Sequence, residues 1–231
     1  MSRPYWDKNI RNWSSLYLKI SHTGETFACP KFLEKLYHLT LTPIEARLMR
    51  QRYRKTMEFI ESQAREGVVF GDLGCGSGIF AVEILRRGAS VVCVDYSASS
   101  LTMARESIEH HCPEHLSRAS FVQLDLVEAP IPRCDVAMAL GVAPYVADIE
   151  SFFGNILPHT RQFYCLMVDP GHFYNRVRQW IPVLNVRRLH FHARERIDRI
   201  YRKHGWELRR REDFASGYLD WAIAPSTARQ A

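Results

Sequence analysis

The fold is decided by a glycine-rich stretch that reads Val68-Val69-Phe70-Gly71-Asp72-Leu73-Gly74-Cys75-Gly76-Ser77-Gly78-Ile79. Its apolar start predicts a buried strand, and a helical pattern from Phe80 to Arg87 follows directly and ends at Gly88. Glycines between a strand and a helix let the backbone turn tightly and approach a ligand, and the helix start offers unpaired N–H groups. A dinucleotide loop of the G-x-G-x-x-G type would need a glycine where this chain has Ile79. The stretch therefore predicts a ligand site of another kind.

Short apolar runs and helical patterns alternate after this loop. The runs typical of strands are Val91 to Asp95, Phe121 to Asp125, Val136 to Leu140 and Phe163 to Val168, and the helical patterns are Ser99 to His110 and Ile149 to Leu157. This alternation indicates an α/β fold with a parallel sheet covered on both faces. Near the C-terminus a helix over Glu195 to His204 precedes two runs, Trp206 to Arg210 and Leu219 to Ile223, that predict an antiparallel hairpin.

The chain before this pattern predicts an N-terminal helical extension over residues 1–66, attached to a domain over 67–231. Thr42-Pro43-Ile44-Glu45 combines an N-cap threonine, a proline at the first helical position and a glutamate three residues after the cap. The helix is expected to run to about Glu66, with one stripe formed by Leu48, Met49, Arg52, Tyr53, Met57 and Ile60. The aromatic residues of 1–40 suggest a lid over a cleft, and packing on the flank of the sheet is the alternative.

Two more aspartates stand at the ends of expected strands. Asp95 ends the second strand, where a carboxylate can accept both hydroxyls of a ribose, and Asp125 ends the third. Ligands of open α/β sheets bind at this carboxyl edge. Each aspartate alone would be read as a capping or turn residue. Together with Asp72 and the glycine loop they favour a nucleoside-containing cofactor.

The loop from Asp72 to Gly78, Asp95 and Gln123-Leu124-Asp125-Leu126 together resemble the class I S-adenosylmethionine-dependent methyltransferases. The resemblance covers about Gly67 to Ala224 and implies a doubly wound, seven-stranded, mostly parallel sheet of order 3-2-1-4-5-7-6, with strand 7 antiparallel. It implies S-adenosyl-L-methionine as the cofactor. The contacts it implies are Asp72, Gly74, Cys75, Gly76, Ser77 and Gly78 at the methionine part, Asp95 at the ribose, Tyr96, Asp125 and Leu126 at the adenine, and Leu140 and Gly141 near the sulfonium.

Residues on the acceptor side are expected after the fourth and fifth strands. Gly141-Val142-Ala143-Pro144-Tyr145 departs from the Asn/Asp-Pro-Pro-Tyr signature of nucleobase amino-methyltransferases and lacks the Pro-Cys of the C5-pyrimidine enzymes. After the fifth strand, an Asp169-Pro170-Gly171 turn opens an insertion of about residues 170–194 and should project His172 over the acceptor as a general base, although a plain loop residue is the alternative. The catalytic candidates are His172 and Tyr145, and the candidate substrate contacts are Tyr145, His172, Arg176, His190 and His192.

A finer resemblance links this region to bacterial methyltransferases that act on sugars and tetrapyrroles. It implies methyl transfer to an oxygen of a small-molecule or glycan-linked acceptor, and it names no particular one. Two alternatives remain open, an RNA methyltransferase and a non-catalytic scaffold that binds the cofactor.

The charge of the chain is concentrated in one segment. The 231 residues carry a formal charge of +6, and the ten basic and four acidic residues between Val186 and Glu212 account for all of it. This segment suits a solvated face, an anionic small substrate or RNA.

Several classes of protein are not expected. Charges near the N-terminus argue against a signal peptide, and no apolar run approaches the roughly 20 residues that span a bilayer. Cys93 and Cys165 lie within apolar strands and suit a reduced, cytoplasmic protein. Pro113 separates His111 from His115, so no metal site is expected there. The sequence leaves the oligomeric state open.

Overall fold

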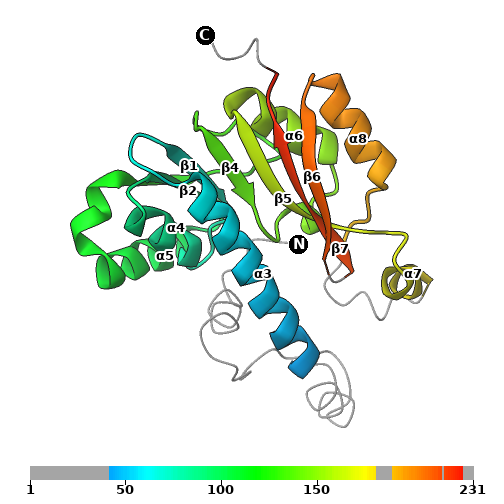
Figure 1. The fold of residues 1–231 in the computed structure, drawn as a ribbon, viewed down its shortest axis with the longest axis horizontal. Helices are drawn as coiled ribbons and strands as arrows, with labels where there is room; N and C mark the ends of the chain where they lie inside the picture. The colour runs from blue at the N-terminus through cyan, green and yellow to red at the C-terminus, as the bar shows by residue number, and fades with distance from the viewer. Residues whose placement is uncertain (1–41, 181–188, 215, 226–231) are drawn as a thin grey trace.

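The computed structural model describes residues 42–180, 189–214 and 216–225 (Figure 1). The proposed lid over residues 1–40 and the basic residues Arg187 and Arg188 lie outside these ranges. Within the described ranges, no helix is both long and apolar enough to cross a membrane.

The strands form one seven-stranded sheet in the order β3-β2-β1-β4-β5-β7-β6. Their bounds are β1 Val69–Leu73, β2 Ser90–Asp95, β3 Ala119–Gln123, β4 Val136–Ala139, β5 Gln162–Val168, β6 Glu207–Phe214 and β7 Gly217–Ile223. Strands β1 to β5 pair in parallel, whereas β7 runs antiparallel to both β5 and β6. The expected doubly wound topology is confirmed, including its reversed last strand.

Helices cover both faces of this sheet (Figure 1). Their bounds are α3 Thr42–Gln63, α4 Ile79–Arg86, α5 Ala98–His111, α6 Ile149–Ile156, α7 Phe173–Trp180 and α8 Arg194–Lys203, with 3₁₀ turns η1 Pro113–Arg118, η2 Ala143–Tyr145 and η3 Leu157–His159. Helices α3, α4 and α5 share one buried apolar cluster with the sheet, and α6 and α8 share a second on the opposite face. The apolar strands are therefore shielded on both sides, as their sequence predicts.

Helix α3 is attached to the sheet by specific contacts. The ring of Phe59 stacks on Tyr164 of β5 at 4.1 Å between centroids and meets Trp221 of β7 edge-on at 5.8 Å. Lys55 forms an ion pair with Glu212 of β6 at 2.5 Å. These contacts hold α3 against β5, β6 and β7 of the sheet.

Helix α7 lies in the insertion of about residues 170–194, for which no helix was predicted. Its exposed residues include Phe173 and Trp180, while polar Asn175 is fully buried, so hydrophobicity does not mark the buried face of this helix. The amide of Asn175 donates to the carbonyls of Asp169 and Ser216 at 2.7 and 2.5 Å. The start of α7 is thus held by polar contacts that a hydrophobic pattern cannot reveal.

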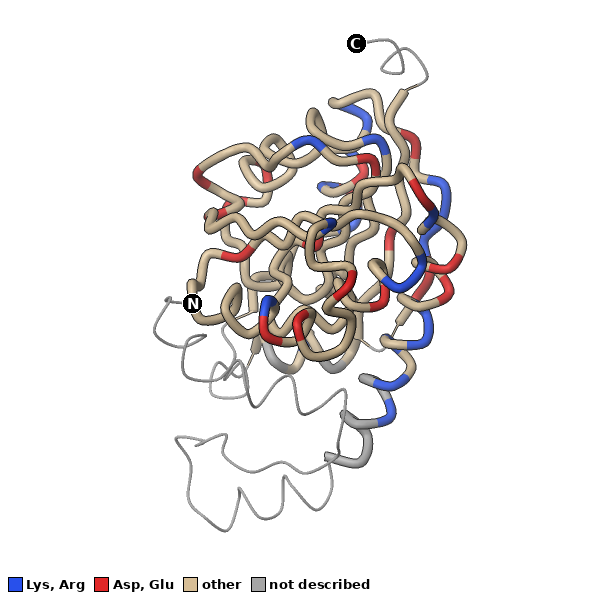
Figure 2. The backbone as a smooth tube through the Cα atoms, turned by 90° about the vertical axis from the view of Figure 1, so that its left-hand side faces the viewer, with Lys and Arg blue, Asp and Glu red and all other residues tan. Residues whose placement is uncertain are grey.

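The basic segment is largely paired with carboxylates. Its ion pairs join Arg194 to Asp169 and Asp213, Arg196 and Lys203 to Glu150, Arg209 to Glu207, Arg210 to Glu212, and Arg211 to Asp198 and Asp220. Acidic and basic positions are likewise interspersed along the backbone in Figure 2. Much of the positive charge therefore serves the fold itself.

Candidate functional site

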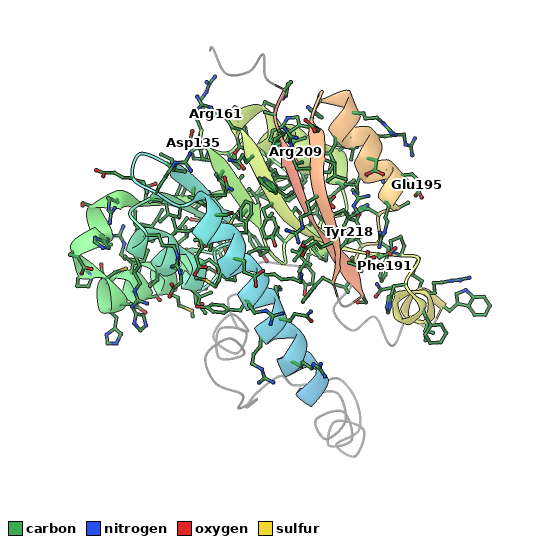
Figure 3. All side chains as sticks on the ribbon, viewed as in Figure 1. Asp135, Arg161, Phe191, Glu195, Arg209 and Tyr218 are labelled. Carbon is green, nitrogen blue, oxygen red and sulfur yellow. The ribbon has the colours of Figure 1, made fainter. Side chains whose placement is uncertain are left out.

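A cavity of about 620 Å³ opens at the carboxyl edge of β1, β2 and β4. Figure 3 shows the two ends of the sheet, with the Asp135–Arg161 pair at the amino ends of β4 and β5 and Tyr218 toward the carboxyl end of β5. The residues expected at the cofactor that line the cavity are Asp72, Gly74, Cys75, Gly76, Ser77, Asp95, Tyr96, Asp125, Leu126, Leu140 and Gly141, and Tyr145 lines it too. Gly78, His172, Arg176, His190 and His192 are outside the lining. Its size suits a small-molecule site.

The glycine loop brings the backbone close to this cavity. Gly74, Gly76 and Gly78 have φ angles of 69°, 54° and 72°, in the left-handed region that favours glycine. A Cβ atom on Gly74 would lie 2.1 Å from the side chain of Val142, and one on Gly78 would lie 2.9 Å from Ala104 of α5. Gly74 thus permits a close approach of β1 and the β4 loop, whereas Gly78 permits the packing of α4 against α5.

Asp95 is held by the loop that it faces. Its Oδ2 accepts a hydrogen bond from the Gly76 backbone N–H at 3.1 Å, and its Oδ1 accepts one from Ser97 at 3.0 Å. These two bonds fix the orientation of the carboxylate at the end of β2. The geometry suits a carboxylate that is oriented in advance for a diol.

Asp72 is a buried acid, and one of its carboxyl oxygens lacks a hydrogen-bond partner among the described residues. It is 3 % exposed, and no hydrogen-bond partner for its Oδ2 occurs among the described residues. Burial, together with a smaller contribution from the neighbouring Asp95 carboxylate, raises the pKa of Asp72 to about 7. A buried carboxyl in a cavity needs a cationic or donor group for satisfaction. The ammonium of an amino-acid ligand fits this requirement.

The opposite wall is built from the segment after β3. Asp125 lies two residues beyond the strand, where its Oδ1 accepts a hydrogen bond from the Val127 N–H at 3.0 Å. Leu126 is buried beside it, and the amide of Gln123 donates to the carbonyl of Tyr96 at 3.1 Å. These contacts hold an acidic and apolar wall next to the end of β2, as a purine would require.

The turn η2 carries Tyr145 into the cavity, and the end of the insertion supports that turn. The backbone N–H of His190 donates to the carbonyl of Pro144 at 2.8 Å, and Nε2 of His192 lies 2.8 Å from the carbonyl oxygen of Val146. Burial lowers the pKa of His192, so a neutral ring donates to Val146 near pH 7. His192 was expected to face the substrate, and in the structure its ring holds the Tyr145 turn.

His172 occupies a different place from Tyr145. It is exposed at the start of α7, where its backbone N–H donates to the carbonyl of Asp169 at 3.3 Å. Arg176 is also exposed, on the first turns of the same helix. The structure therefore brings Tyr145, but not His172, to the wall of the cavity.

An ion pair joins the last residue of the insertion to the residue just before its start. Arg194, its last residue, donates from Nη2 and Nε to Oδ2 of Asp169 at 2.6 and 3.1 Å. The same guanidinium lies 4.7 Å from the ring centroid of Tyr218 and reaches Asp213 at 2.6 Å. This anchoring sets where the insertion leaves and rejoins the sheet, and one of its residues, Leu189, lines the cavity.

Sequence reasoning missed several lining residues. They include Arg52 of α3, Ser100 of α5, Leu166 and Val168 of β5, and Leu189. Ser100 is 1 % exposed, and its hydroxyl has no hydrogen-bond partner among the described residues. One signal was available for Arg52, because it interrupts an otherwise mostly apolar helical stripe.

Known proteins resemble this chain over the same region. A family model for a methyltransferase domain matches residues 72–162. A ubiquinone biosynthesis O-methyltransferase of Bradyrhizobium sp. is 30 % identical over 147 residues, which are 59 % of this chain and 53 % of that protein. A magnesium-protoporphyrin O-methyltransferase of Rhodobacter capsulatus is 35 % identical over 69 residues, 30 % of each chain. This chain thus spans about half the length of the first relative and less of the second.

The fold also matches solved structures over nearly its whole length. The crystal structure of a magnesium protoporphyrin IX methyltransferase from Synechocystis PCC 6803 with bound S-adenosylhomocysteine (SAH) superposes with a TM-score of 0.70. That match covers 96 % of this chain and 97 % of the other at 16 % identity. At this identity, the likeness establishes the fold.

Proposed function

We propose that this chain transfers a methyl group from S-adenosylmethionine to an oxygen of an apolar small molecule, because residues 72–162 match a methyltransferase family model and the sheet has the strand order expected of the class I fold. The observation that carries the proposal is the buried Asp72 carboxyl, which shares the cavity with the glycine loop and with the oriented carboxylate of Asp95. When bound, the cofactor supplies a methyl group activated by a sulfonium.

The cofactor-side residues have complementary tasks. Asp72 would accept a hydrogen bond from the ammonium of the methionine part. Asp95 would accept hydrogen bonds from the ribose hydroxyls, while the backbone N–H groups of Gly76 and Ser97 hold its carboxylate in place. Leu126 and Tyr96 would flank the adenine. These roles need no movement of the described backbone, because the donors and acceptors already face one cavity.

The lining residues that come from the segment around η2, from β5 and from the insertion are mostly apolar. They include Val142, Pro144, Tyr145, Leu166, Val168 and Leu189, which would form the acceptor side. Such a wall suits an aromatic or aliphatic skeleton better than a glycan, whose hydroxyls would lose hydrogen bonds to water without gaining partners. It also helps to align the reactants and exclude water, both of which an in-line displacement requires. The names of the two curated relatives support O-methylation of a small molecule.

The proposal is tested by two measurements on the full chain. Calorimetric titration should detect binding of SAH, and absence of binding would contradict the assignment of the cofactor. Transfer of a labelled methyl group from S-adenosylmethionine should then favour apolar phenols or carboxylic acids over sugars and RNA. Transfer to RNA alone, with an affinity that falls steeply with salt, would contradict the small-molecule acceptor and support the RNA alternative. SAH binding without transfer to any acceptor would support the scaffold alternative.

Tyr145 and His172 are the two catalytic candidates on the acceptor side, and substitution of each tests which one contributes to turnover. With an acceptor in hand, we expect Tyr145→Phe to lower turnover by about 10²-fold, as removal of a proton-transfer or positioning hydroxyl does. His172→Ala should lower turnover less, because the structure keeps His172 outside the cavity lining. Both variants should bind SAH as the unaltered chain does. A larger loss for His172→Ala would instead assign His172 as the general base.

A further inference from the structure

Helix α3 contributes a charged side chain to the cavity from outside the matched methyltransferase region. Arg52 lines the cavity, whereas the family model begins at residue 72. A Cβ atom built on Gly141 would lie 3.3 Å from Nη1 of Arg52, so the guanidinium lies against the backbone just after β4. Gly141 has a φ angle of 93°, a backbone conformation that favours glycine. Because glycine has no Cβ, the guanidinium of Arg52 can lie close to the backbone at this position.

Arg52 shares the cavity with acidic side chains. The other charged residues that line the cavity are Asp72, Asp95, Asp125, Glu128 and Asp148, so Arg52 is the one basic residue among the described lining residues. An anionic group of a ligand would be repelled by these carboxylates and attracted by Arg52. Among the described lining side chains, Arg52 is therefore the one that offers a positive charge to a ligand carboxylate.

The position of Arg52 is set by the packing of α3. Thr56, Phe59 and Ile60 are buried further along the helix, Tyr53 stacks on Phe80 of α4 at 5.9 Å, and Arg87 of α4's C-terminus reaches Glu61 at 2.9 Å. A guanidinium on a packed helix is a better anchor than one on a loop, because less side-chain and backbone freedom is lost on binding.

We propose that Arg52 binds the carboxylate of the methionine part of the cofactor and that α3 is thereby part of the cofactor site. This inference rests on the proposed function. The methionine part is a zwitterion, and Asp72 provides for its ammonium but not for its carboxylate. A planar guanidinium can donate two parallel hydrogen bonds to a carboxylate, which lysine cannot do.

The test combines variants of the chain with a ligand that lacks the group in question. Binding of SAH is compared by calorimetry with binding of its analogue that keeps the amine and lacks the carboxylate. We expect the unaltered chain to bind the analogue about 10- to 100-fold more weakly, as loss of a charged hydrogen-bond pair predicts. Arg52→Gln should bind SAH about as weakly and should distinguish the two ligands by less than about threefold. Arg52→Lys should recover part of the preference for SAH.

Arg54→Gln is the matched control, because Arg54 lies on the same helix and is 70 % exposed. It should keep the full preference for SAH, and thermal unfolding checks that both glutamine variants are folded. The inference is overturned if Arg52→Gln binds SAH unchanged, or if it binds both ligands weakly and still prefers SAH by the original factor. Failure of the proposed function looks different, because the unaltered chain would then bind neither ligand.

Discussion

Asp220→Ala is expected to lower the free energy of unfolding by about 3 kcal/mol. Asp220 is fully buried on β7 and accepts hydrogen bonds from Nε and Nη2 of Arg211 at 2.7 and 2.8 Å. The carboxylates of Asp220 and Asp198 raise the pKa of Arg211, which stays charged. Removal of Asp220 would leave the largely buried Arg211 cation with Asp198, 2.9 Å away, as its one remaining acidic partner among the residues that the structure describes. Urea denaturation measures the loss.

Two controls separate this pair from ordinary surface charge. Glu207→Ala removes the partner of Arg209 in an exposed ion pair and should change the unfolding free energy by about 1 kcal/mol or less. Combining Arg211→Met with Asp220→Leu replaces both charges with apolar groups, and this double variant should be more stable than Asp220→Ala alone. A loss for Asp220→Ala as small as that for Glu207→Ala would contradict a structural role for the pair.

Arg211 also shows why the role of the basic segment could not be predicted from sequence. Strand β6 was expected to end at Arg210, and it continues to Phe214. Its register with β7 shifts between Leu208 and Arg210, so alternation counted along the sequence does not predict which arginine faces inward. Arg211 pairs directly across from Asp220 as a result. The net charge of the segment does not reveal that Arg211 is paired with a buried aspartate outside the segment.

The cofactor side was predictable for the opposite reason. Asp72 and the glycines form one contiguous strand, loop and helix start, and Asp95 ends the next strand in the parallel sheet. Local patterns therefore suffice to bring them to one edge. Arg52, Leu189 and His192 reach the site region through contacts between distant segments, so sequence spacing carries little information about them.

Asp72→Asn is expected to weaken SAH binding at pH 8 by about 10- to 100-fold and to remove its pH dependence, because the charged partner of the ligand ammonium is lost. Burial raises the pKa of Asp72 to about 7 in the free protein. A bound ammonium favours the ionised carboxylate, so the unaltered chain should bind SAH more tightly as the pH rises through 7 and release a proton below that pH. Calorimetry at pH 6 and 8 in buffers of different ionisation enthalpy measures both effects.

The same substitution should stabilise the free protein at alkaline pH. A carboxyl whose folded pKa is raised from 3.8 to about 7 binds more protons in the folded state, so its contribution to stability falls as the pH rises between these values. Asp72→Asn removes this loss and should raise the unfolding free energy at pH 8 by about 1–3 kcal/mol, and by less at pH 5. Asp125→Asn is the control, because Asp125 lines the same cavity but is less buried than Asp72. This variant should still bind SAH more tightly at pH 8 than at pH 6. At pH 8, SAH binding by Asp72→Asn that is as tight as binding by the unaltered chain would show that Asp72 does not meet the ligand's ammonium, whereas an affinity of the unaltered chain that stays constant from pH 6 to 8 would show that its carboxyl is already ionised over this range.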